Sequence, residues 1–337
     1  MPSLEAMLER KAQGLSQSAI ANALGTSVGV VAGKLWRHKN SAARAEHVTK
    51  KTVIQFPSAQ VVKRPESQDS DMPQWIARRD SLLRQNDFIR VMHLNDVHLP
   101  FHDTAALSLW FEIAGRFNPH IVVVGSDMLD LPTISDFAPD KDISVDDWQE
   151  QSREFYWPMV NQLDKLLPNA LLVWIYGNHE RRALKAIKAS DSPKIGMSYF
   201  IETVRCGGRV LHVGRTEHVE IGGLVIAHGN KAGKYAADKV GAYWLTKTVN
   251  FGHIHKHQSL GNGFSNGKLC LPPHYDSWAY PNTETSGTST MTVDTLPFGG
   301  VSWSYHNFVQ TEGAMWTQYG DGLIQVDDNK QAGQAAA

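Results

Sequence analysis

The residues best suited to catalysis follow short apolar runs that have the character of buried strands. One such run, 170–175, leads directly into Tyr176-Gly177-Asn178-His179-Glu180. Gly177 allows a sharp turn, Asn178 offers an uncharged oxygen, and His179 can carry a proton near neutral pH. Ligands of α/β proteins gather at the carboxyl ends of strands. The stretch therefore predicts a functional site at that edge of a sheet.

Two further runs end in acidic residues. Asp96 and His98 follow the predicted strand 88–94, and their spacing places both on one side of an extended chain, where they could bind the same cation. Asp127 follows the strand 120–124, and its two oxygens could bridge two divalent cations about 3.5–4 Å apart. Asp130 could orient neighbouring ligands or cap the next turn.

Histidines end two more predicted strands. His228 and Gly229 follow the run 224–227, and Gly252-His253-Ile254-His255 follows 249–251. A single polar turn after a strand is a common feature and says little about function. Five such turns along one chain indicate a shared site.

These motifs, in this order, resemble the pattern of the calcineurin-like metallophosphoesterases, D-x-H, G-D-x-x-[DN], G-N-H-[DE], H-[GA] and G-H-x-H. The resemblance spans residues 88–256, about half of the chain. Ser126 departs from it, because the family usually has glycine before the bridging aspartate. The resemblance implies an α/β fold, a four-layer αββα metallophosphoesterase sandwich.

The resemblance also implies two bound metal ions. One would be held by Asp96, His98, Asp127 and His255, and the other by Asp127, Asn178, His228 and His253. Oxygen and imidazole donors suit Mn²⁺, the ion we expect, as well as Fe, Zn or Mg. A bridging hydroxide would attack phosphorus in line, and His179 would protonate the leaving oxygen or stabilise its charge, with Glu180 or Asp96 holding its tautomer.

Further elements must position these turns. Helical patterns span 104–117, 145–167, which Pro158 must kink or divide, and 236–246. The runs 209–213 and 218–221 are expected to pair as strands. Short β-prone runs after residue 260 predict a carboxyl-terminal β extension whose aromatic residues pack in the core.

The amino-terminal residues 1–40 resemble a compact helix-turn-helix with helices near 4–12, 16–24 and 27–38. Its predicted DNA contacts are Lys34, Arg37 and Lys39, because a recognition helix needs cations beside it. A small helical bundle used for dimerisation is the alternative. Residues 41–74 then form a flexible linker, 75–328 the catalytic domain with its β extension, and 329–337 a disordered tail.

Charge distribution, cysteine content and the lack of long apolar runs indicate which class of protein this is. Residues 1–64 hold ten Lys/Arg and three Asp/Glu, a net charge of +7, which leaves −8 for the rest because the whole chain carries −1. The two cysteines form no CxxC and indicate a reducing cytoplasm. No apolar run approaches the length of a membrane span, and the start lacks the apolar core of a signal peptide.

The sequence therefore predicts a dimetal-dependent phosphoester hydrolase, directed at DNA as a phosphodiesterase or nuclease by its amino-terminal module. A phosphomonoesterase acting on nucleotides or phosphoproteins is the alternative, and a DNA-binding regulator with an inactive phosphoesterase domain is a second. The GDxVDRG pattern of the family's Ser/Thr phosphatases is absent, since Leu131-Pro132 follow Asp130. The combination resembles bacteriophage genes, which would place the protein in the host cytoplasm. Oligomeric state is left open.

Overall fold

The computed structural model describes residues 3–13, 15, 17–25, 70–130, 152–189, 193–214, 216–271, 285–296, 299–311 and 314–327. The chain divides into two compact units, Met1–Arg64 and Pro65–Ala337, which we treat separately.

In the first unit, α1 (Leu4–Ala12) and α2 (Gln17–Ala23) lie where the sequence predicts the first two helices. Ser3 caps α1 by accepting a hydrogen bond from the Ala6 amide, and Met7 and Ile20 are buried. The predicted third helix, with Lys34, Arg37 and Lys39, lies outside the described residues. So do linker residues 41–69 and the predicted tail.

The larger unit alternates strands and helices in its first part and is mainly β in its last. Its α-helices are α4 (Met72–Gln85), α5 (Thr104–Phe117), α7 (Trp157–Leu166), α8 (Asn178–Ala189), α9 (Pro193–Arg205) and α10 (Ala236–Gly241). Three short helical turns have a hydrogen-bond pattern other than that of the α-helix: η2 (Ser152–Tyr156), η3 (Cys206–Gly208) and η4 (Ala242–Trp244). Helix α4 begins inside the segment assigned to the linker, because Asp71 accepts a hydrogen bond from the His212 amide and pairs with Arg205.

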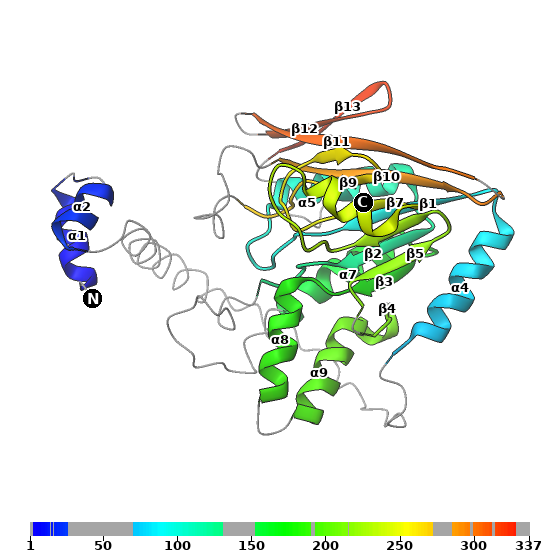
Figure 1. The fold of residues 1–337 in the computed structure, drawn as a ribbon, viewed down its shortest axis with the longest axis horizontal. Coiled ribbons are helices and arrows are strands. Elements are labelled where there is room, and N and C mark those ends of the chain that lie inside the picture. The colour runs from blue at the N-terminus through cyan, green and yellow to red at the C-terminus, as the bar shows by residue number, and fades with distance from the viewer. Residues whose placement is uncertain are drawn as a thin grey trace. The chain divides into compact units, whose positions relative to one another are not determined.

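Eight strands form the larger sheet, in the order β13-β12-β11-β10-β1-β2-β3-β4. Its parallel half consists of β1 (Phe88–Leu94), β2 (Ile121–Gly125), β3 (Leu171–Ile175) and β4 (Val210–His212). Its antiparallel half consists of β10 (Ser286–Asp294), β11 (Val301–Thr311), β12 (Ala314–Tyr319) and β13 (Gly322–Asp327). The latter is the β extension that the sequence predicts (Figure 1).

The smaller sheet has the order β5-β6-β7-β9-β8. Its strands are β5 (His218–Ile221), β6 (Leu224–Ala227), β7 (Thr248–Phe251), β8 (Gln258–Leu260) and β9 (Gly263–Ser265). β6, β7 and β9 run parallel, so β6 and β7 end at the same edge.

Three apolar cores separate the layers. Ile89, Val91 and Ile226 belong to the core between the two sheets. The other face of the large sheet packs against α5, α7, α8 and α9, and the outer face of the small sheet packs against α10. The larger unit is therefore an α/β structure with two sheets between helices, which is the layering the sequence predicts.

One predicted pairing is wrong. Residues 209–213 and 218–221 do not pair with each other, because β4 extends the large sheet beside β3 and β5 forms a hairpin with β6 in the small one. The chain crosses from one sheet to the other between these strands. The helix predicted over 145–167 is divided as expected in its described part, where η2 leads into α7 with Pro158 in the first turn. No helix in the described part of the chain is long and apolar enough to cross a membrane.

Candidate metal centre

Five loops meet where strands of the two sheets end. Residues after β1, β2 and β3 come from the large sheet, and residues after β6 and β7 come from the small one. Backbone hydrogen bonds join the first two loops, since the Asp96 amide donates to Ser126 O and the His98 amide to Asp127 O. The topology thus brings together motifs that are up to 159 residues apart in the sequence.

The backbone of these loops is held in an unusual conformation. Of the eight non-glycine residues with positive φ in the described chain, six belong to the candidate site. They are Asp96, His98, Ser126, Asp127, His253 and His255, with φ between 49° and 72°. The left-handed region is costly for such residues, and strain of this kind concentrates at functional sites.

Two glycines leave room for the carboxylates. A Cβ on Gly177 would lie 2.1 Å from Asp127 Oδ1, and one on Gly252 would lie 2.4 Å from Asp96 Oδ2. The glycines of the G-N-H and G-H-x-H motifs are therefore required by close packing against the two aspartates.

Asp127, Asn178, His228 and His253 form one cluster of donor atoms. His228 Nε2 lies 3.5 Å from Asp127 Oδ2 and 2.8 Å from Asn178 Oδ1, and His253 Nδ1 lies 3.0 Å from the same Asn178 oxygen. A reversed Asn178 amide would donate its NH₂ to both rings and to Asp127. We favour the oxygen-inward orientation, because the donors that surround it could then share one cation.

Asp96, His98 and His255 form the second cluster. His98 Nε2 and His255 Nε2 lie 3.2 Å apart, and His255 Nε2 lies 3.7 Å from Asp96 Oδ1. A ligand atom each of His98, His255 and Cys270 lies within 4.8 Å of the others. No sequence signal pointed to Cys270 at this place, because it lies in no metal-binding motif.

The spacing of these atoms fits metal coordination. Two ligands about 2.1 Å from one ion and 90–110° apart are separated by about 3.0–3.4 Å. The separations in both clusters lie close to this range, and the aspartate oxygens and imidazole nitrogens are donors for Mn, Fe, Zn or Mg-like ions. The residues present therefore fit a pair of divalent cations, with Asp127 placed to be shared.

Burial keeps the imidazoles neutral. It lowers the pKa of His98 and of His228 to about 3, and it lowers the pKa of His253 and His255 as well. Burial opposes ionisation of Asp127, but the polar rings of His228, His179 and His98 and a hydrogen bond from the His179 amide favour the carboxylate, so the pKa of Asp127 lies below its usual range. Neutral rings around a carboxylate are the protonation state that metal binding requires.

Several polar groups hold the candidate ligands in place. Ser126 Oγ lies 2.7 Å from His228 Nδ1, so this departure from the family pattern supplies a hydrogen bond to a candidate ligand. Asp130 Oδ1 lies 3.1 Å from His98 Nδ1. Such contacts fix the tautomer and direction of a ligating ring.

Glu180 forms hydrogen bonds with other groups than His179, the partner that the sequence analysis expects. Its carboxylate accepts hydrogen bonds from the amides of Asp127, Met128, Leu129 and Gly177. It therefore holds the Asp127 loop against the start of α8 and does not hold His179.

His179 lies beside Asp127, with Nε2 3.9 Å from Asp127 Oδ2. Its Nδ1 lies 2.6 Å from the Asp130 carbonyl oxygen, so Nδ1–H donates to that oxygen. The prediction that Glu180 or Asp96 holds the tautomer is thus wrong. Nε2 faces Arg182 Nη1 at 3.4 Å, and a ligand atom of His179 lies within 4.8 Å of one each of His98 and Asp127.

A buried polar network supports Asp96 from between the sheets. Asn95 Nδ2 donates to the Asp96 carboxylate, and Asn266 Nδ2 donates to Asn95 Oδ1 at 2.8 Å. Asn250 Nδ2 donates to Asn266 Oδ1, and its own oxygen lies 2.9 Å from His93 Nδ1. The only sequence signal of this network was a polar residue inside an apolar strand, His93 in β1 and Asn250 in β7.

The two arginines after Glu180 differ in position. Arg181 pairs with Glu217, whereas the Arg182 guanidinium faces His179. Arg182 is therefore the one placed to meet a phosphate oxygen near the candidate acid.

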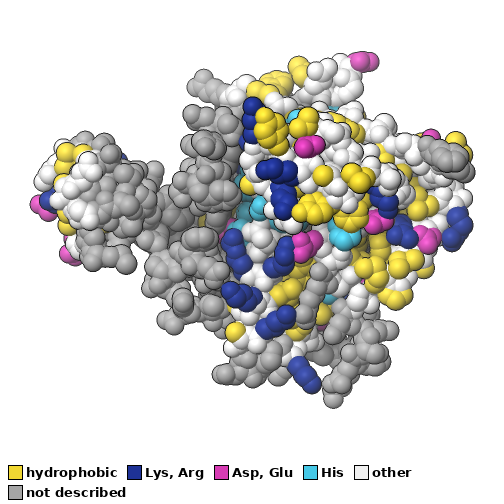
Figure 2. All heavy atoms as spheres, viewed as in Figure 1, with side chains coloured by type: hydrophobic (Ala, Val, Ile, Leu, Met, Phe, Trp, Pro, Cys, Tyr) yellow, Lys and Arg dark blue, Asp and Glu magenta, His cyan; other side chains and the backbone are white. Residues whose placement is uncertain are grey.

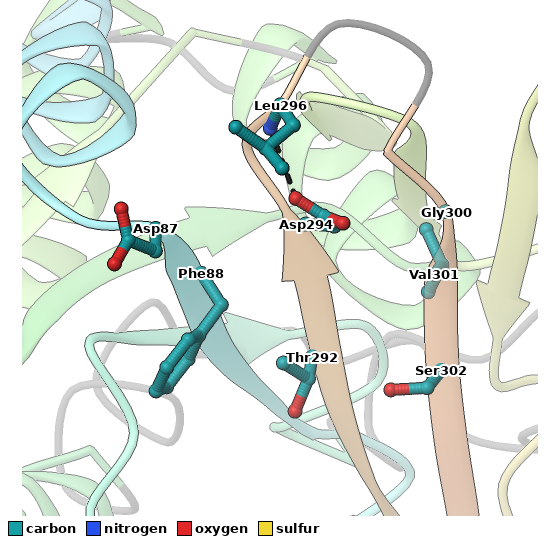
Figure 3. Close-up of a pocket in the computed structure, with 8 residues that line it drawn as sticks. All are labelled: Asp87, Phe88, Thr292, Asp294, Leu296, Gly300, Val301 and Ser302. Atoms are coloured by element: carbon teal, nitrogen blue, oxygen red, sulfur yellow. Dashed lines mark hydrogen bonds between the residues drawn. The ribbon is translucent and has the colours of Figure 1, made fainter.

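A surface depression in another part of the unit is unrelated to this chemistry. It is lined by Phe88 at the start of β1 and Asp294 at the end of β10 (Figure 3). Asp96 follows the opposite end of β1, so the depression lies at the far edge of the sheet.

The sequence matches no family model, and no curated protein matches it. Solved structures that resemble the chain include an archaeal phosphodiesterase, with 12% identity and a TM-score of 0.32, over 64% of this chain and 99% of that one. Another is wild-type Vps29 from Entamoeba histolytica complexed with zinc, with 12% identity and a TM-score of 0.35, over 72% and 100%.

Proposed function

We propose that the chain is a dimetal-dependent phosphoesterase of the calcineurin-like type that hydrolyses phosphodiesters. The observation that carries the proposal is the convergence of donor atoms from five loops, with Asp127 adjacent to both histidine clusters. When bound, two divalent cations would supply Lewis-acid charge and an activated water. Seven residues would hold them: Asp96, His98, Asp127, Asn178, His228, His253 and His255.

The remaining residues have separate roles in this proposal. His179, with Nδ1–H fixed on the Asp130 carbonyl, presents Nε2 toward the centre and would protonate the leaving oxygen or stabilise its charge. Arg182 would bind a non-bridging phosphate oxygen beside it. Glu180 and Asp130 keep Asp127 and His98 in position.

The substrate we favour is DNA. Positive charge at residues 1–64 and the predicted helix-turn-helix support it, with Lys34, Arg37 and Lys39 as the proposed contacts. Such an enzyme would act in a cytoplasm, that of the host for a phage-encoded protein.

The test uses small esters and DNA side by side. We expect hydrolysis of bis-p-nitrophenyl phosphate, plasmid and single-stranded DNA with Mn²⁺, and little release from p-nitrophenyl phosphate. Turnover of the monoester alone would favour a phosphomonoesterase. No turnover with metal bound would favour a DNA-binding regulator with an inactive domain. Deletion of residues 1–64 should weaken DNA binding and leave hydrolysis of the small diester intact, whereas unchanged DNA binding would refute the helix-turn-helix.

A further inference from the structure

Positive charge is concentrated in two segments that carry residues of the candidate metal centre. Residues 178–189 hold four Arg/Lys and one acidic residue, Glu180, which is buried. Residues 229–256 hold five Lys and one Asp. The whole unit after residue 64 carries −8, so these segments attract anions to the site against the average charge. Lys and Arg side chains accordingly gather beside the histidines in Figure 2.

The segment after His228 also exposes aromatic rings. Tyr235 is 51% exposed and Tyr243 is 64% exposed. Lys234 Nζ lies 5.3 Å from the centre of the Tyr235 ring, and Lys231 Nζ lies 5.5 Å from that of Tyr243. Within the described chain, neither lysine forms an ion pair with a carboxylate. Each tyrosine thus presents an apolar ring next to an available cation.

This surface is close to the metal centre and held in place. Lys231 follows His228 by three residues, so their Cα atoms are at most about 11 Å apart. Gln258 Nε2 donates to the Gly233 oxygen at 3.0 Å, and Gln258 Oε1 accepts from the Ala237 amide at 3.2 Å. Gln258 starts the strand that follows the His255 loop, so the two parts of the site are tied together.

We propose that Lys231, Lys234, Tyr235 and Tyr243 form a binding surface for single-stranded nucleic acid that leads to the metal centre. Lysines would contact phosphates while tyrosines stack on bases, a combination suited to single strands. Bases in a duplex are paired and stacked on each other, so they would not reach the rings. The inference rests on the proposed function and deepens it, because it names the form of the substrate.

Binding can be tested without catalysis. The full chain in EDTA is titrated with a fluorescent oligothymidylate, an oligouridylate and a duplex of equal length at several salt concentrations. We expect K231A/K234A to weaken single-strand binding and to reduce the slope of log K against log salt by about 1.4, or about 0.7 for each lost contact. Y235A and Y243A should each weaken it about fivefold or more at unchanged slope.

The matched control is R116A/K165A, which removes the same charge from exposed residues at the carboxyl ends of α5 and α7, at the opposite edge of the large sheet. It should bind as wild type. A 5-bromouracil oligonucleotide should photocrosslink to the peptide containing Tyr235 or Tyr243, which separates this surface from residues 1–64. Equal binding of the DNA and the RNA oligonucleotide would also support the proposal. It would mean that other parts of the chain distinguish DNA from RNA.

Three results would overturn the proposal: variants that bind like the control, crosslinks confined to residues 1–64, or lysine variants that weaken binding while tyrosine variants do not. The last would indicate a site for any polyanion, including an acidic peptide. Hydrolysis of bis-p-nitrophenyl phosphate with Mn²⁺ should be unchanged in all these variants. If the wild-type protein does not hydrolyse this diester, the proposed phosphoesterase function is refuted, whatever the binding result.

Discussion

Replacing Gly177 with alanine should disable the centre without changing any ligand. The new Cβ would lie 2.1 Å from Asp127 Oδ1 and 2.3 Å from its amide nitrogen, whereas real Cβ contacts under 3.0 Å essentially never occur. The carboxylate or its loop must therefore move by about 0.9 Å or more. A displacement of about 1 Å can cost about 100-fold in rate, or about 2.7 kcal/mol of transition-state stabilisation.

The assay is kcat/KM for bis-p-nitrophenyl phosphate at saturating Mn²⁺, together with the metal content of the dialysed protein. G300A is the control, because a Cβ on Gly300 meets no atom within 4 Å. We expect G177A to lose about 100-fold or more in kcat/KM and part of its metal, and G300A to stay within about twofold of wild type. A folded G177A with wild-type kcat/KM would refute the close packing of Asp127.

Four further substitutions test other parts of the account. S126G removes the hydroxyl that contacts His228, so metal affinity measured by calorimetry should fall about 10–100-fold. It also relieves the backbone strain of a non-glycine residue at φ 62°, so thermal stability should be kept or raised. Equal metal affinity would show that the hydroxyl does not matter. H179A should keep its metals and lose most turnover, whereas D127A should lose metal by elemental analysis; full activity of H179A would exclude it as the acid. Burial lowers the pKa of His93 to about 4, so as pH drops from 6.5 toward 4 the unfolded chain takes up a proton at His93 before the folded chain does, and the free energy of unfolding falls. Between pH 7 and pH 5, urea unfolding in EDTA should show that H93Q loses about 2 kcal/mol less of its free energy of unfolding than wild type does. Equal losses would contradict this.

The sequence predicted those features that depend on local pattern. The bounds of the helix at 104–117 agree with α5, because its apolar spacing, its Asp103 cap and the left-handed Asn118 at its end all lie within a few residues. The turns after β1, β2 and β3 were placed correctly for the same reason. Their positions at strand ends, together with the resemblance to the calcineurin-like pattern, led to the seven predicted ligands, which stay a prediction.

Features set by long-range contacts were missed or misassigned. The partner of β4 is β3, and no local signal in 209–213 distinguishes that pairing from one with 218–221. The contact of Ser126 with His228 joins residues 102 positions apart, and the Asn266–Asn95 contact spans 171. His179 takes its partner from Asp130 because two loops meet, which the spacing within either loop does not show.

Manganese loading tests the central claim most directly. Wild-type protein titrated with Mn²⁺ should bind about two ions per chain and give the electron paramagnetic resonance signal of an exchange-coupled pair, because a shared carboxylate places them about 3.5–4 Å apart. D127A should lose that coupled signal. Binding of a single ion, or of two ions whose spectra remain uncoupled, would contradict a centre built around Asp127.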